Sequence, residues 1–214
     1  MERICIDTMG PFPEADGYQH ILVIIDAFIR FVDLYPIKLL DGKEAAHTLL
    51  QYIGRFGTPY QIMSDKGPQF VNEVVETLCN TLLKNEKIEG HLYSKQENGI
   101  VERMNKEILK HLRALMMVIK QFDLWPQYLP LVQRIINATP HSAIGVSPAQ
   151  LLFGNAIHLD KSLVQFAEHS KNIPSYEPPQ NCREWVDKML SVQSFLIRTA
   201  QDRQKERCEA FGTK

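Results

Sequence analysis

Cysteine is scarce in this chain and is not grouped. The four cysteines, Cys5, Cys79, Cys182 and Cys208, are scattered over 214 residues, and none belongs to a Cys-x-x-Cys pair. A structural zinc site needs closely spaced ligands, and a disulfide scaffold needs many more cysteines per residue. The sequence therefore favours neither class, and we expect free thiols in a reducing compartment.

Long apolar runs are also missing. No run approaches the roughly 20 apolar residues that cross a bilayer. Met1 is followed by the charged Glu2 and Arg3, which is not typical of a secretory signal. With 44% hydrophobic and 23% charged residues, the composition is that of a folded soluble protein. We expect an intracellular protein that does not insert into membranes.

The chain also lacks a strong net charge. The formal charge of −1 argues against a dedicated nucleic-acid coat protein. The charges are unevenly distributed, however: residues 1–99 hold 9 basic and 14 acidic side chains, and residues 100–214 hold 15 and 11. An acidic half beside a basic half is compatible with a carboxylate cluster next to a surface that faces a polyanion.

Hydrophobic periodicity predicts an α/β fold. Three β-type runs come first, and units of helix and strand follow before the pattern becomes helical from Gly99 onward. This order predicts a mixed sheet with helices packed on it. The expected strands are 4–7, 18–28, 31–37, 60–64 and 88–92; the expected helices lie between Asp41 and Gly57, over 71–83, from Gly99, over 124–136, and between Ser147 and Gly154. Asp41 and Ser147 are expected to cap the starts of their helices. The expected inward stripe of the helix from Gly99 is Val101, Met104, Ile108, Leu112 and Leu115.

The last 60 residues carry a weaker pattern. Residues 172–180 contain three prolines and are the best linker candidate. After them, apolar residues alternate at spacings of four and three for about two heptads, which is too short to predict a coiled coil. Packing against the core and self-association both remain open for this helix. The residues of the pattern are Trp185, Met189, Val192, Leu196 and Thr199.

Three carboxylates occupy positions of interest. Asp7 lies within the first predicted strand, Asp65 at the end of the fourth, and Glu102 near the start of the long helix. A carboxylate within an apolar strand is unfavourable unless a partner compensates its desolvation, and a metal ion is a common partner. Oxygen ligands suit Mg²⁺. Position alone leaves the ordinary alternative open, since an Asp at a strand end is often a turn former.

The residues around these carboxylates resemble, in order, the blocks of the integrase catalytic core, with the nearest likeness to gypsy-type LTR retrotransposons and retroviruses. The similarity covers about residues 4–155. Its most specific part is the separation between the third and fourth blocks. The blocks are Ile6–Pro11, Ile21–Phe28, Ser64–Phe70, Glu97–Asn105 and a downstream segment over 139–154.

This resemblance implies an RNase H-like core over 1–155, a five-stranded mixed sheet flanked by helices, followed by a linker and helical extension over 156–214. The D,D-35-E triad of the family would be Asp7, Asp65 and Glu102, which would hold two Mg²⁺ ions, with Mn²⁺ as a substitute. Glu97 is a weaker alternative for the third carboxylate, because the Asn98-Gly99 pair beside it predicts a turn. Gly99 is expected to keep a loop flexible.

Basic residues near the carboxylates predict DNA contacts. Arg103, Lys106 and Lys110 follow Glu102 at helical spacings, and Lys66 is adjacent to Asp65. A solvated helix face is the alternative.

Two further residues are weaker candidates for the site. Asp26, at the end of the second predicted strand, is interpreted as structural, and His91 as a loop residue rather than an acid or base. Leu109 stands where the family often has a second lysine.

The implied function is DNA integration by a metal-dependent polynucleotidyl transferase, which processes the 3′ ends of element DNA and joins them to target DNA. Such an enzyme acts in the nucleus and as a homo-oligomer, although no import signal is evident. We expect a core without the family's zinc-binding domain. The alternatives are a catalytically inert or domesticated DNA-binding or assembly module and, third, a ribonuclease H or junction resolvase.

Overall fold

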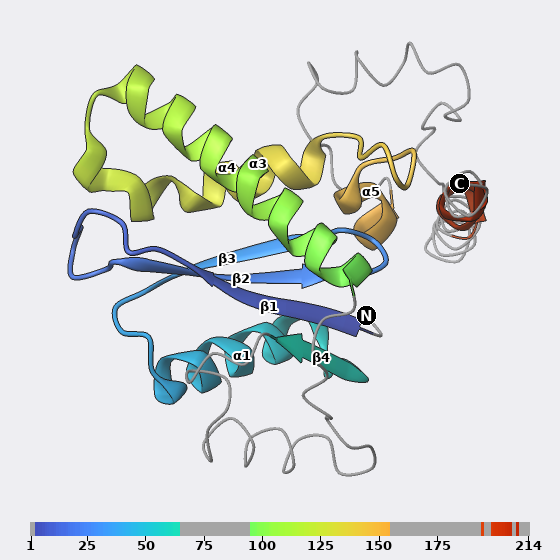
Figure 1. Ribbon diagram of the computed structural model, residues 1–214, viewed down its shortest axis with the longest axis horizontal. Coiled ribbons are helices and arrows are strands. Elements are labelled where there is room, and N and C mark those ends of the chain that lie inside the picture. The colour runs from blue at the N-terminus through green and yellow to red at the C-terminus, as the bar shows by residue number, and fades with distance from the viewer. Residues whose placement is uncertain (1–2, 65–94, 155–193, 195–197, 207–208, 210–214) are drawn as a thin grey trace, which may run out of the picture. The chain divides into compact units, whose positions relative to one another are not determined.

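The computed structural model describes residues 3–64, 95–154, 194, 198–206 and 209 (Figure 1). The chain divides into two compact units, Met1–Ile136 and Asn137–Lys214. The first unit holds a sheet and the helices around it, and the second holds short helical segments. No helix in the described ranges is long and apolar enough to span a membrane.

Four strands form a mixed sheet in the order β3-β2-β1-β4. Strand β2 pairs antiparallel with both β1 and β3, and β1 pairs parallel with β4. The expected mixed sheet is therefore confirmed. The fifth expected strand (88–92) and the helix expected over 71–83 lie outside the described residues. The strands are β1 (Arg3–Met9), β2 (His20–Asp26), β3 (Val32–Ile37) and β4 (Gln61–Ser64).

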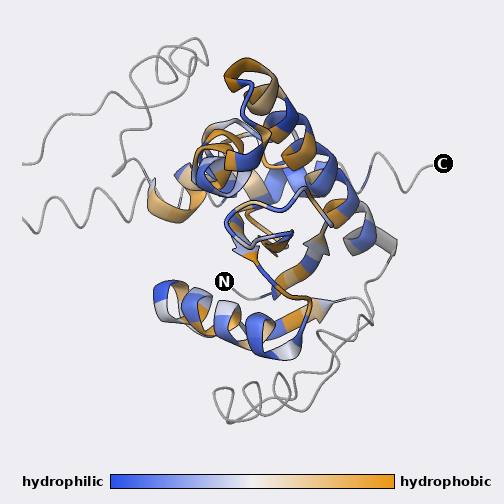
Figure 2. Cartoon of the chain, turned by 90° about the vertical axis from the view of Figure 1, so that its left-hand side faces the viewer, coloured by the Kyte–Doolittle hydropathy of each residue, from blue (hydrophilic) through white to orange (hydrophobic). Residues whose placement is uncertain are grey.

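Helices cover both faces of the sheet, and successive strand residues alternate between them. Ile4 and Ile6 join the apolar cluster under α1 (Gly42–Phe56). Cys5 and Met9 join the cluster under α3 (Lys95–Ile119) and α4 (Trp125–Ala138). Figure 1 shows α1 on one side of the strands and α3 and α4 on the other. Hydrophilic and hydrophobic residues alternate along these helices (Figure 2), as expected where one side packs on a sheet.

The sequence signals at the ends of α1 act as predicted. Asp41 caps the helix, since its Oδ1 accepts a hydrogen bond from the Glu44 N–H at 2.8 Å. At the other end Gly57 has φ +82°, a conformation that favours glycine, and its N–H donates to the Ile53 carbonyl. Leu49 and Tyr52 are buried against the sheet between these caps.

The start of α3 differs from the prediction. The helix begins at Lys95, so Glu97, Asn98 and Gly99 are helical rather than part of a flexible loop. Glu102 is therefore about two turns inside the helix. The local turn signal is overridden because one stripe of the helix packs into the core over about four turns, which outweighs about 1 kcal/mol for one glycine. The buried members of that stripe are Val101, Met104, Ile108, Leu112 and Met116.

In the second unit, α5 (Pro148–Phe153) confirms the predicted cap. The Ser147 hydroxyl accepts from the Gln150 N–H, and the Gln150 side chain accepts in return from the Ser147 N–H. Further along the chain, Ala200 is completely buried and the Arg203 side chain lies against Gly145. This part of the C-terminal segment thus packs within its own unit. Most of the predicted apolar pattern before it lies outside the described residues.

Candidate active site on strand β1 and helix α3

Asp7 lies on the face of β1 that α3 covers. Strand alternation places it between Cys5 and Met9, which both belong to the apolar cluster under that helix. Its side chain is half-buried. A carboxylate at such a position needs polar partners, because burial without them is unfavourable by several kcal/mol.

Asn105 on α3 supplies one partner. Its Nδ2 donates a hydrogen bond of 2.6 Å to Asp7 Oδ2, joining residues 98 positions apart in the chain. The other amide atom, Asn105 Oδ1, is buried and accepts no hydrogen bond within the described ranges. A buried unpaired carbonyl oxygen beside a carboxylate leaves an oxygen donor for a further ligand.

Glu102 lies on the same helix, three residues before Asn105, and its side chain is exposed. Residues three apart are neighbours on a helix surface. Two of the three predicted carboxylates therefore flank Asn105: Asp7 through the hydrogen bond and Glu102 through the helix.

The third carboxylate, Asp65, lies outside the described residues, as do Lys66 and His91. The last described residue of β4, Ser64, pairs with Ile6, the residue before Asp7. Over the described part of the chain, no three His, Cys, Asp or Glu side chains form a group that could hold a metal ion. The triad is accordingly still a prediction.

The donors that are present fit a hard divalent cation. Carboxylate and amide oxygens are the ligands that Mg²⁺ accepts, and Mg²⁺ is commonly held by only one or two protein carboxylates. Asp7, Glu102 and the unpaired Asn105 Oδ1 provide such oxygens from two adjacent elements. Cys5, the nearby thiol, is buried within the apolar cluster, so the donor set has no soft ligand.

The predicted basic residues lie exposed along α3. Arg103, Lys106 and Lys110 are all on the solvent side of the helix. Arg103 donates through Nε to the Gly99 carbonyl at 2.7 Å, and Lys110 forms a weak surface pair with Glu107 at 3.4 Å. Leu109, which stands where the family often has a lysine, packs against the core.

Asp26 has a structural role, as predicted. It is buried, and its Oδ1 accepts hydrogen bonds from the N–H groups of Phe28 and Ile29 at 2.8 Å each, which forms the turn after β2. Burial raises the pKa of Asp26 above its ordinary value, and the two N–H donors oppose this shift. Both of these hydrogen bonds stabilise the turn.

Asn105 was not among the predicted site residues. The spacing Glu102-x-x-Asn105 could have identified it, since a polar side chain one turn from a candidate ligand shares its helix face. The distance to Asp7, however, depends on the packing of α3 on β1, which local patterns do not report.

Known proteins with similar sequences are retroviral and transposon polyproteins, although no protein-family model matches the chain. The chain is 31% identical over 201 residues to the Pro-Pol polyprotein of simian foamy virus type 3, covering 86% of the chain and 17% of the relative. It is 36% identical over 143 residues to the feline leukemia virus Gag-Pol polyprotein, covering 66% and 8%. The Pol polyprotein from transposon 412 of Drosophila melanogaster is 24% identical over 216 residues, covering 100% and 16%. The chain thus spans less than a fifth of each relative.

Solved structures with a similar fold are integrases. The catalytic core domain of BIV integrase aligns with TM-score 0.55 at 21% identity, covering 79% of this chain and 97% of that one. The HTLV-2 integrase catalytic core domain in complex with magnesium, in a trimeric form, gives 0.56 at 20% identity, covering 70% and 94%. A simian T-cell lymphotropic virus intasome in complex with PP2A regulatory subunit B56 gamma gives 0.61 at 19%, covering 84% and 59%.

Together the mixed sheet, the flanking helices and these alignments define an RNase H-like α/β protein. Within that class, the chain is related to a segment of the Pol polyproteins of retroviruses and retrovirus-like transposons, and its fold is that of the integrase catalytic core.

Proposed function

We propose that this chain is the catalytic core of an integrase that cleaves the 3′ ends of element DNA and joins the new 3′-hydroxyls to target DNA. The observation that carries the proposal is the convergence of Asp7 and Asn105, from β1 and α3, one helical turn from Glu102. Because both elements are anchored in one apolar cluster, these polar groups are held on a rigid support at the surface of the fold.

Divalent metal ions are the proposed cofactors. A relative of this fold, the HTLV-2 core, was solved with magnesium. In this chain Asp7, Asp65 and Glu102 would hold two Mg²⁺ ions, or Mn²⁺. Such ions lower the pKa of a bound water or hydroxyl and stabilise the leaving oxygen of a phosphodiester. Asn105 fixes the orientation of the Asp7 carboxylate through its N–H donor.

DNA is the proposed substrate and partner. Arg103, Lys106 and Lys110 project from α3 beside Glu102, and Lys66 follows Asp65 in the sequence. Cations at this spacing can neutralise successive phosphates, which gives binding that weakens with salt. We further propose a homo-oligomer on DNA in the nucleus, since integrase relatives were solved in dimeric and trimeric forms and as an intasome.

The test is a gel assay on labelled branched DNA that mimics an integration intermediate, with Mg²⁺ or Mn²⁺. We expect metal-dependent strand cleavage and joining by the chain and its loss in Glu102→Gln. Glu107→Gln is the matched control, because Glu107 is an exposed carboxylate on the same helix that pairs with Lys110. Products that persist in Glu102→Gln would contradict the site. Absence of all products with retained DNA binding would point instead to an inert assembly module.

A further inference from the structure

The outer edge of strand β3 is occupied by side chains. In the sheet order, β3 lies at one end with only β2 beside it among the described strands. A strand at a sheet edge presents backbone N–H and C=O groups to any other strand that approaches. On β3 the N–H of Leu34 points away from β2, since it donates to a side chain of α4 rather than to the β2 ladder.

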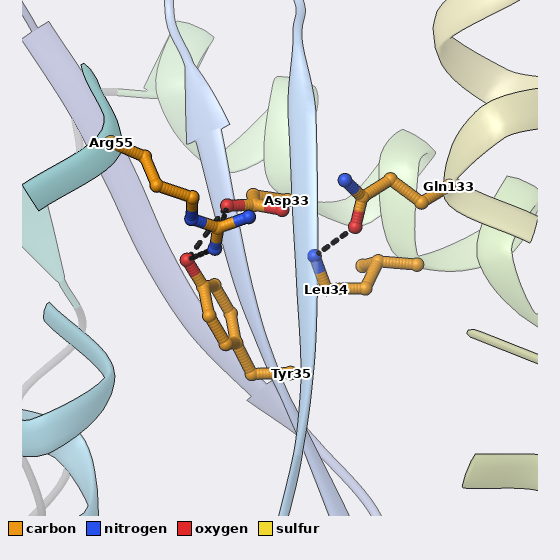
Figure 3. Close-up of polar contacts among 5 residues, drawn as sticks. All are labelled: Asp33, Leu34, Tyr35, Arg55 and Gln133. Atoms are coloured by element: carbon orange, nitrogen blue, oxygen red, sulfur yellow. Dashed lines mark hydrogen bonds and ion pairs between the residues drawn. The ribbon is translucent and has the colours of Figure 1, made fainter. Parts of the chain in front are cut away.

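The acceptor is Gln133. Its Oε1 accepts the Leu34 N–H at 2.9 Å (Figure 3). Two residues along, at the next position that faces outward, β3 has Pro36, which carries no N–H. Two successive outward donor positions of β3 are thus unavailable to another strand, one through a hydrogen bond and one through residue type.

A buried polar cluster holds α1 at the same place (Figure 3). Asp33, only 2% exposed, accepts from the Tyr35 hydroxyl at 2.7 Å and pairs with the Arg55 guanidinium at 2.8 Å. Arg55 comes from the last turn of α1, donates to the Tyr35 hydroxyl as well, and lies over the Tyr35 ring with its Cζ 5.1 Å from the centroid. Asp33 therefore ties the end of α1 to β3, while Gln133 ties α4 to the neighbouring residue Leu34.

We infer that Gln133, Pro36 and the Asp33 cluster close the β3 edge to strand addition, so that a second copy of this chain cannot extend the sheet there. The inference concerns the fold and stands independently of the proposed enzymatic activity. An edge with free N–H and C=O groups favours pairing between the sheets of neighbouring copies. With the edge closed, copies associate through other surfaces.

The first test measures hydrogen exchange at the Leu34 amide in Gln133→Met, which preserves side-chain length and removes the acceptor. We expect exchange at Leu34 to rise between about twofold and tenfold, in keeping with the loss of one hydrogen bond. Gln127→Met is the control, because Gln127 is exposed on the same helix and its Nε2 lies 3.5 Å from Asp16. Unchanged protection of Leu34 in Gln133→Met would overturn the proposed role of Gln133.

The second test also restores the backbone N–H that Pro36 lacks. The variant Gln133→Met/Pro36→Val has the outward N–H groups of residues 34 and 36 free, and we expect concentration-dependent assemblies with extra β-structure in sedimentation and infrared spectra. Pro36→Val alone, which leaves the Asp33 cluster intact, should show the same tendency more weakly and covers the case in which the double variant does not fold. Sedimentation and spectra equal to the wild type in both variants would overturn the inference.

Discussion

At the scale of single residues, the link between Asp7 and Asn105 organises the candidate site. A charged carboxylate and an amide donor at 2.6 Å make a strong hydrogen bond. It fixes one oxygen of Asp7 while Asn105 presents its own unpaired Oδ1 to the same region. Such support of a metal-binding carboxylate by a neighbouring side chain affects metal affinity by roughly 10–100-fold in characterised sites.

Removal of this support gives the first prediction. In Asn105→Ala, the Asp7 carboxylate loses its donor, and we expect the Mg²⁺ concentration for half-maximal strand transfer to rise by about 10-fold or more. Titration of activity against Mg²⁺ measures this shift. A variant that is only less stable would keep the same Mg²⁺ dependence at a temperature where it stays folded. Asn98→Ala, at an exposed position of the same helix, is the control. An unchanged Mg²⁺ dependence in Asn105→Ala would contradict a positioning role.

The buried carboxylates give a second prediction, on pH. Burial raises the pKa of Asp26 in the folded chain, so the folded state binds its proton more tightly than the unfolded chain does. This contribution to stability is full below the unfolded pKa of about 3.9 and disappears as pH rises through the folded pKa. Asp33 is shifted in the same direction. In Asp26→Asn the side-chain oxygen still accepts both turn N–H groups and the charge is gone.

We therefore expect Asp26→Asn to be at least as stable as the wild type at pH 7.5, with this difference shrinking as pH falls toward 4. Urea unfolding at several pH values measures it. Asp123→Asn, which changes an exposed carboxylate, should show no such trend. A wild type that loses stability relative to Asp26→Asn on acidification would show that the sign is wrong.

At the scale of elements, two glycines with opposite backbone requirements test the account of helix ends. Gly99 lies inside α3, and among the described residues a Cβ there would meet only the Arg103 Nη2 at 3.7 Å, an ordinary contact. Gly57 ends α1 with φ +82°. We expect Gly99→Ala to raise the free energy of unfolding by about 0.5–1 kcal/mol and Gly57→Ala to lower it by a similar amount. Thermal or urea unfolding measures both changes in the free energy of unfolding. Destabilisation by Gly99→Ala would support a turn at that position.

These elements also show what local sequence can predict. The caps of α1 and α5 and the apolar stripe of α3 follow from residues within one or two turns of each other, and each was predicted. The start of α3 was not, because the Asn98-Gly99 signal is local and the packing that overrides it is not. Of the candidate site, Asp7 and Glu102 were predicted from their motifs, and their roles stay predictions. Asn105 could not be linked to Asp7, since they are 98 residues apart.

At the scale of the whole molecule, the uneven charge along the chain corresponds to the two elements that form the candidate site. The first half of the chain, with its excess of acidic residues, supplies β1 and Asp7. The second half, with its excess of basic residues, supplies α3 and its exposed cations. The hydrogen bond from Asn105 to Asp7 joins these two halves. A half-buried carboxylate thus lies beside a basic helix face, which is the arrangement that the proposed phosphodiester substrate would require.

The last prediction concerns this helix face and DNA. Lys106 makes no hydrogen bond or ion pair with another described residue, and Lys110 makes only an exposed pair with Glu107, so both can reach phosphates at little cost. If each contacts one phosphate, Lys106→Ala and Lys110→Ala should each reduce the slope of log affinity against log salt by about 0.9. Lys43→Ala provides the control, because Lys43 is exposed on α1, across the sheet from α3. Fluorescence anisotropy on labelled duplex at several salt concentrations measures the slopes. Salt slopes equal to the wild-type slope in all three variants would place the DNA on another surface. A reduced slope in the α3 variants alone would place the DNA along this helix, beside Glu102.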